Sequence, residues 1–117
     1  INVMLGFEVA HIGINSACAE TSLELAKSLS SIFNMPLKEG NSSNFAGKGI
    51  EVNKTKGKGA HGHIAIATNT ISRACSYLQR KGIAVDMDTA KKKNGQLIAV
   101  YLKDEIGGFA VHLLQKK

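Results

Sequence analysis

The stretch HGHIAIAT, residues 61–68, decides the fold because it describes a strand with two different faces. Side chains alternate along a strand, so His63 lies on a face of small residues, whereas Ile64 and Ile66 lie on the opposite, aliphatic face. The same pattern occurs earlier in the chain, in HIGIN at residues 11–15. This repetition predicts a protein built from two similar halves.

Each of the two strands leads into a helical pattern and then into three short runs that are typical of strands. The spacing of apolar residues predicts helices over about 17–33 and 70–81. The runs are PLKEG, SNFAG and GIEVNK in the first half, and IAVDM, QLIAVYLK and FAVHLLQ in the second. Asn94-Gly95 is the clearest hairpin signal. We therefore predict an α+β fold of two β-α-β-β-β modules, at about 7–54 and 61–115, whose curved mixed sheets surround a cleft.

The repeat also selects candidate functional residues. When the last strands of the two halves are aligned, Glu51 takes the place of His112, and each stands opposite a pair of apolar neighbours. Together with the histidines of the two first strands, this gives four candidates: His11, Glu51, His63 and His112. His61 shares a face with His63 but lies at the strand edge, so we interpret it as a flanking residue.

Three imidazoles and one carboxylate that converge from four strands match the ligand set of a divalent transition metal, such as zinc, nickel, iron or manganese. An isolated histidine in a strand is more often a hydrogen-bonded structural residue, and Glu51 alone is more often a solvated charge. The prediction of a metal site therefore depends on the four residues together. Glu51 is also the candidate catalytic base.

Size and charge limit the classes of function. With 117 residues, the chain fits one domain. The net charge of +6 comes mainly from Lys54, Lys56, Lys58, the run at 91–93 and the tail at 116–117. These lysines fall in predicted loops and at an end, so we expect no nucleic-acid partner, although their charge would attract an anionic ligand. We also expect no membrane segment and a cytoplasmic location.

The two cysteines carry little functional signal. Cys18 and Cys75 form no CxxC pair, and both fall in predicted helices, where cysteine behaves as a small apolar residue. We therefore expect neither a disulfide nor a catalytic thiol.

The doubled plan, with AHIGIN at 10–15 and GHIAIAT at 62–68, resembles the vicinal oxygen chelate superfamily, which includes glyoxalase I, fosfomycin-resistance proteins, extradiol dioxygenases and bleomycin-resistance proteins. The resemblance covers nearly the whole chain. In that superfamily the metal ligands come from the first and last strands of each module, which implies His11, Glu51, His63 and His112 here. The site lies within one chain in some members and across a homodimer in others, and the sequence leaves both arrangements open.

A narrower resemblance involves MLGFEVAHIGIN, KEGNSSNFAGKGIEV and YLKDEIGGFAVHLLQKK, at 4–15, 38–52 and 101–117. These segments are similar to a domain that follows the barrel in some bacterial keto-hydroxyglutarate and keto-deoxyphosphogluconate aldolases. Because the chain begins at Ile1, we expect it to be a segment of a longer protein with an upstream aldolase. A barrel does not fit in 117 residues, so we do not expect this segment to be the aldolase itself.

One departure from the family pattern affects the expected chemistry. Glyoxalase I and the extradiol dioxygenases place a carboxylate on the last strand, where this chain has His112, so only Glu51 is left to accept a proton. The leading hypothesis is a metal-binding domain that acts on, or binds, a small keto or hydroxy carbonyl compound, as a lyase or isomerase of the glyoxalase type. The alternative is a non-catalytic accessory module that senses or sequesters a metabolite.

Overall fold

The computed structural model describes residues 2–116, with side chains described from Met4 to Lys116. Ile1 and Lys117, the first residue and the last of the tail lysines, lie outside the described residues. A short helix that the sequence pattern did not predict, α1 (Asn2–Leu5), precedes the first strand.

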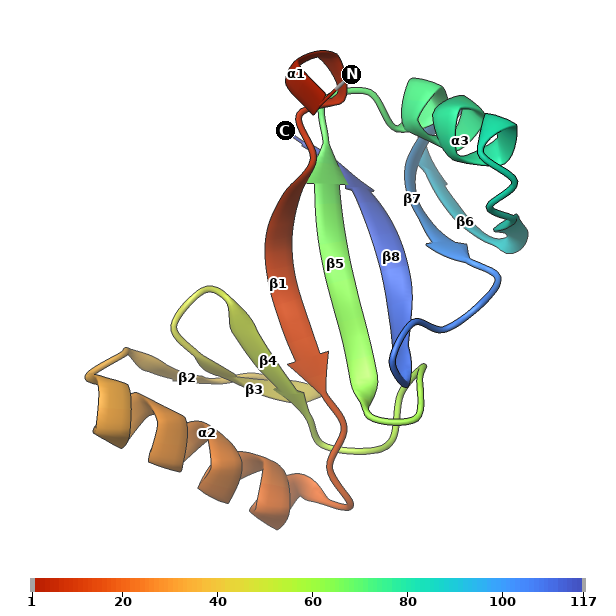
Figure 1. Cartoon of the computed structure of the whole chain (residues 1–117). Coiled ribbons are helices and arrows are strands. Elements are labelled where there is room, and N and C mark those ends of the chain that lie inside the picture. The colour runs from red at the N-terminus through yellow and green to blue at the C-terminus, as the bar shows by residue number, and fades with distance from the viewer. Residues whose placement is uncertain (1, 117) are drawn as a thin grey trace.

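The N-terminal module consists of one long helix and four strands (Figure 1). Its elements are β1 (Glu8–Ile14), α2 (Ala19–Phe33), β2 (Leu37–Glu39), β3 (Ser43–Ala46) and β4 (Ile50–Asn53). The helix packs against β2, β3 and β4. It begins two residues later than predicted and ends at the predicted residue.

The C-terminal module repeats this order with longer strands. Its elements are β5 (Gly62–Thr68), α3 (Ile71–Arg80), β6 (Val85–Lys93), β7 (Gln96–Leu102) and β8 (Phe109–Gln115). The predicted hairpin at Asn94-Gly95 is confirmed: both residues have positive φ, and they connect the antiparallel strands β6 and β7.

Within the described residues, the two modules join into one eight-stranded mixed sheet, in the order β2-β3-β4-β1-β5-β8-β7-β6. The junction is the antiparallel pair β1 and β5, which lie side by side at the centre of Figure 1. Each of these strands pairs in parallel with the last strand of its own module, β4 or β8. The predicted glyoxalase-like α+β fold is therefore confirmed, and both predicted halves of the site lie in one continuous sheet.

The two modules have different interiors. The C-terminal module contains an apolar cluster in which α3 packs on the sheet, made of Leu5, Ile71, Ala74, Cys75, Val100 and Leu113. In the N-terminal module, buried Ser22 of α2 donates a hydrogen bond to the Val52 carbonyl at 2.7 Å and accepts one from the Asn44 amide at 3.1 Å. The N-terminal module therefore relies partly on buried polar contacts.

None of the helices within residues 2–116 is long and apolar enough to cross a membrane.

Candidate metal centre

Three of the four predicted residues form a close cluster on one face of the sheet. The Nε2 atoms of His11 and His63 lie 3.1 Å apart, and Glu51 Oε1 lies 3.6 Å from the first and 3.3 Å from the second. Each of these residues offers one ligand atom within 4.8 Å of the others. The cluster draws on both modules of a single chain, since β1 and β4 carry His11 and Glu51, and β5 carries His63.

The strand register explains why the cluster forms around Gly13. This residue is the Cα partner of Glu51 across the parallel pair and of His63 across the antiparallel pair. The imidazole of His63 lies over Gly13, and a Cβ atom there would overlap three atoms of the ring. The absence of a side chain at Gly13 therefore allows the His63 ring to reach towards His11 and Glu51.

His112 lies beside the cluster, outside the group of three. Its ring centroid is 6.1 Å from that of His63, and its ring stacks on Tyr101 with centroids 4.4 Å apart and an interplanar angle of 12°. Its Nδ1 atom is buried and has no hydrogen-bond partner among the described residues. No nitrogen of His112 belongs to the group of ligand atoms within 4.8 Å of one another, so in this structure His112 lies outside the ligand set, with a buried nitrogen that lacks a partner within the described part of the chain.

The electrostatics favour neutral imidazoles at the centre of the sheet. Burial lowers the pKa of His63, and the nearby carboxylate of Glu51 partly opposes this effect. Burial, reinforced by the positive charges that His63, His11 and Lys91 can carry, lowers the pKa of His112 to about 4. The neutral imidazole is the form that binds metals, so neither His63 nor His112 needs to lose a proton at neutral pH.

These side chains line a cavity of about 430 Å³. The lining residues include all four candidates together with Ser43, Asn53, Thr55, Gly57, Lys58 and Tyr101. Asn15 fixes the loop at the mouth, because its side-chain oxygen accepts hydrogen bonds from the Asn53 amide at 3.1 Å and from the Gly57 backbone N–H at 3.0 Å. The cavity is thus bounded by the sheet on one side and by the β4–β5 loop on another.

Sequence reasoning missed Tyr101, although a signal was present. Tyr101 lies in the predicted strand QLIAVYLK and is the Cα partner of His112. Finding it would have required the register of the antiparallel pair β7 and β8, which the sequence pattern alone does not specify. Burial and the charge of Glu51 both raise the pKa of Tyr101, so its hydroxyl keeps its proton at neutral pH.

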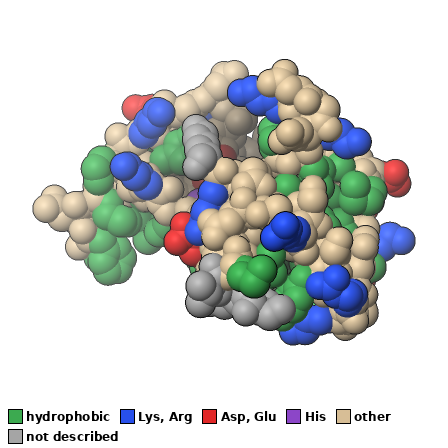
Figure 2. All heavy atoms as spheres, turned by 90° about the horizontal axis from the view of Figure 1, so that it is seen from above, with side chains coloured by type: hydrophobic (Ala, Val, Ile, Leu, Met, Phe, Trp, Pro, Cys, Tyr) green, Lys and Arg blue, Asp and Glu red, His purple; other side chains and the backbone are tan. Residues whose placement is uncertain are grey.

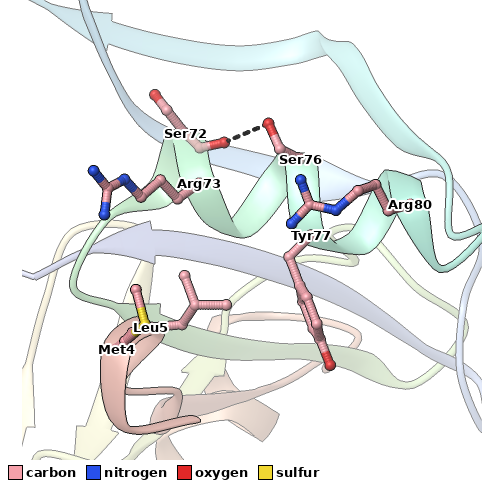
Figure 3. A pocket seen from close by; sticks show the side chains of 7 residues that line it. All are labelled: Met4, Leu5, Ser72, Arg73, Ser76, Tyr77 and Arg80. Atoms are coloured by element: carbon pink, nitrogen blue, oxygen red, sulfur yellow. Dashed lines mark hydrogen bonds between the residues drawn. The ribbon is translucent and has the colours of Figure 1, made fainter. Parts of the chain in front are cut away.

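A second cavity, of about 450 Å³, lies between α1 and α3, away from the cluster. Figure 3 shows Arg73, Tyr77 and Arg80 on α3 and Leu5 on α1, with Ser76 donating a hydrogen bond to the Ser72 carbonyl at 3.3 Å. The described residues that line it include neither a histidine nor a carboxylate. It therefore lacks the donors of a metal centre.

Comparison with solved structures identifies proteins that share this fold. A hypothetical protein from Bacillus halodurans C-125 superposes with a TM-score of 0.64 at 18% identity, covering 95% of each chain. Methylmalonyl-CoA epimerase from Mycobacterium tuberculosis has a TM-score of 0.59 at 17% identity, covering 97% of this chain and 90% of its own. A methylmalonyl-CoA epimerase in complex with methylmalonyl-CoA and NH4+ has a TM-score of 0.59 at 18% identity, covering 92% and 93%.

The sequence matches no protein-family model and no curated protein. At these levels of identity, the structural matches show the fold alone.

Proposed function

We propose that this chain binds a divalent transition metal through His11, Glu51 and His63 and acts on a small keto or hydroxy carbonyl compound. The observation that carries the proposal is the convergence of two imidazole nitrogens and one carboxylate oxygen within 4.8 Å. Such a donor set suits zinc, nickel, iron or manganese. His112 is the proposed fourth ligand, and its unpaired Nδ1 atom supports this assignment.

When bound, such a metal supplies Lewis-acid polarisation of a carbonyl oxygen. The remaining chemistry falls to Glu51, which is the one acidic side chain that lines the cavity in the described part of the chain. Its carboxylate accepts the proton from the carbon next to the carbonyl; the C–H electron pair then forms the enolate, and the negative charge moves to the carbonyl oxygen. Return of the proton from Glu51 to another position of the enolate completes an isomerisation, and inversion at the same carbon requires that the enolate first turn its opposite face towards Glu51.

The structural neighbours support this choice of reaction, because an epimerase inverts a carbon centre and one neighbour was solved with a bound acyl-CoA. We therefore propose isomerisation of a carbonyl compound, with CoA-linked acids among the first substrates to test. Lyase chemistry of the glyoxalase type remains a second reaction class to test for the same residues. Either reaction requires Glu51 as the proton acceptor.

The first test is metal content by elemental mass spectrometry. We expect near-stoichiometric metal in the wild-type protein after reconstitution, and a loss of at least about tenfold in metal affinity in His63→Ala. His61→Ala is the matched control, since His61 is an exposed histidine two positions away that lies outside the cluster. Equal metal binding by the two variants would contradict the proposed centre.

The test of the base uses proton exchange in D2O, followed by NMR on a panel of carbonyl compounds. We expect Glu51→Asp to retain some exchange and Glu51→Gln to lose it, because Gln accepts no proton at neutral pH. Unchanged exchange in Glu51→Gln would exclude Glu51 as the base.

A second candidate function is a non-catalytic module that senses or sequesters a metabolite for an attached keto-hydroxyglutarate or keto-deoxyphosphogluconate aldolase. The observation that favours it is His112, which stands where glyoxalase-type enzymes have a second carboxylate. Binding of a keto acid without proton exchange, together with altered aldolase activity in the full-length protein, would support this function. The attachment to an aldolase is itself part of this proposal.

We further propose that the chain forms a homodimer. Its accessible surface is 7446 Å², whereas a compact monomer of this mass exposes about 6,100 Å². Exposed apolar side chains gather where α2 and β2 lie, as Figure 2 shows, and Ile32 and Phe33 are 71% and 64% exposed. A second copy seated on α2 would bury this surface. Light scattering should give the mass of a dimer, and Phe33→Asp should shift it to the monomer.

We also propose a cytoplasmic location. The free thiols Cys18 and Cys75, both within the described residues, support it, because unpaired cysteines suit a reducing compartment.

A further inference from the structure

We propose that Lys58 and Tyr101 form a subsite for a negatively charged group of the ligand, set apart from the carbonyl at the metal centre. This inference rests on the proposed function and narrows its substrate class to carbonyl compounds that carry a distal carboxylate. Lys58 comes from the loop between β4 and β5, and Tyr101 comes from β7. Both line the cavity that contains the cluster.

The geometry defines one end of the cavity. Tyr101 stacks on His112, a residue that lies outside the group of His11, Glu51 and His63. The Nζ atom of Lys58 lies 4.9 Å from the centroid of the Tyr101 ring. The ammonium group of Lys58 therefore lies over the phenol ring, and the ammonium and the phenol hydroxyl are both hydrogen-bond donors among the lining residues of this cavity.

Charge balance indicates what binds there. Among the described residues, Lys58 forms no ion pair with a carboxylate. Lys58 and Glu51 are the two charged side chains that line the cavity, and their charges cancel. A bound divalent metal would therefore give the cavity a net charge of about two positive units. A ligand with two negative charges neutralises this excess, whereas a neutral carbonyl compound does not.

The structure also distinguishes Lys58 from the lysines around it. Lys54 and Lys56 belong to the same loop region, yet only Lys58 is among the lining residues of this cavity. Of the lysines whose charge the sequence analysis expected to attract an anionic ligand, Lys58 is the one described residue that lines this cavity. Lys56 becomes a matched control, because it has the same charge and lies two positions away.

The test measures binding by titration calorimetry to the zinc-loaded protein with two probes. 2-Oxoglutarate carries a distal carboxylate, and 2-oxopentanoate has the same chain length with a methyl group in that position. We expect the wild type to bind 2-oxoglutarate at least about tenfold more tightly, an advantage typical of a charge-assisted contact. Lys58→Met should lose most of this preference, Lys58→Arg should retain it, and Tyr101→Phe should reduce it by about threefold.

Three results would overturn the subsite: equal binding of both probes by the wild type, no binding of 2-oxoglutarate at millimolar concentration, or equal losses in Lys56→Met and Lys58→Met. Metal content, measured on the same samples, separates this proposal from the proposed function. A preference lost in Lys58→Met at full metal occupancy supports the subsite, because a folding or metal defect would lower the metal content. If the wild-type protein binds no metal and still prefers 2-oxoglutarate, the result would contradict the proposed metal centre but support the proposed anion subsite.

Discussion

The two modules share one order of elements and differ in what holds them together. The C-terminal module has long strands and an apolar interior that includes Ile71, Val100 and Leu113. The N-terminal module has three short strands and buries Ser22 and Asn44 among small residues such as Ala26 and Ala46. The candidate cluster nevertheless takes two of its three residues from the N-terminal module. This difference suggests that the C-terminal module anchors the sheet, whereas the N-terminal module completes the site.

The largest effect is expected from truncating one buried valine in each module, which tests whether the two interiors contribute differently to stability. Val52 and Val100 are both fully buried. We expect Val100→Ala to lower the free energy of unfolding by about 3 kcal/mol and Val52→Ala by about 1.5 kcal/mol, because larger side chains surround Val100 and lose more contacts. Urea denaturation measures both values. Equal losses would show that the two interiors are equivalent.

The junction between the modules should be the next most sensitive place. Gly13→Ala would place a Cβ atom within the ring of His63, so the ring must move away from the cluster. We expect a loss of about 2 kcal/mol in the free energy of unfolding and a loss of metal binding. Gly49→Ala is the control, since a Cβ there meets no described atom within 4 Å. If Gly13→Ala still binds metal, the His63 ring does not have to lie over residue 13 for the metal to bind.

The polar interior of the N-terminal module is tested on α2. Ser22→Ala removes the hydroxyl that pairs with the Val52 carbonyl and the Asn44 amide, so we expect a loss of about 1.5 kcal/mol in the free energy of unfolding. Ser28→Ala, an exposed change on the same helix, should cost less than about 0.5 kcal/mol. Similar values for the two variants would indicate that the buried polar contacts contribute little.

The smallest expected effect is a dependence on pH in the metal-free protein. His112 has a pKa of about 4 in the folded state, against an ordinary value of 6.5, so between these two pH values the unfolded chain binds the additional proton. Stability is then fully present above pH 6.5 and falls as the pH drops towards 4. Because His112 is only half-buried, solvent screening limits the loss to roughly 1 kcal/mol.

Melting curves from pH 7 to pH 4 test this dependence. His112→Gln should make the curve shallower, while His63, whose pKa is also lowered, keeps part of the slope. His61→Gln, at an exposed histidine, is the control. A wild-type curve that is already flat would show that His112 gains no proton on unfolding.

The repeat pattern predicted the parts of the structure that depend on local alternation. The strands around His11 and His63, both long helices and the hairpin at Asn94-Gly95 follow from spacing and turn chemistry alone. The helix α1 was not predicted, because its four residues have no periodicity, and its backbone is fixed by distant contacts such as the hydrogen bond from the Thr68 hydroxyl to the Leu5 carbonyl.

For the candidate site, the sequence identified the four ligand candidates but not how they lie relative to one another. The approach of His63 to Glu51 depends on the register of β1 with β4 and with β5, and the stacking of His112 on Tyr101 depends on the register of β7 with β8. Alternation along one strand does not specify the register between strands. For this reason the sequence pattern could not predict that Tyr101 stacks on His112 or that Lys58 lies over the Tyr101 ring.

The antiparallel pairing of β1 with β5 also has a consequence for how the chain folds. The residues of the cluster are far apart in the sequence, with His11 and His63 separated by 52 positions, so the centre forms only after long loops have closed. Each module can build its outer hairpin from local contacts beforehand. Metal uptake during refolding should therefore be a late kinetic phase that follows the burial of Val100, and its rate should report when the two modules meet.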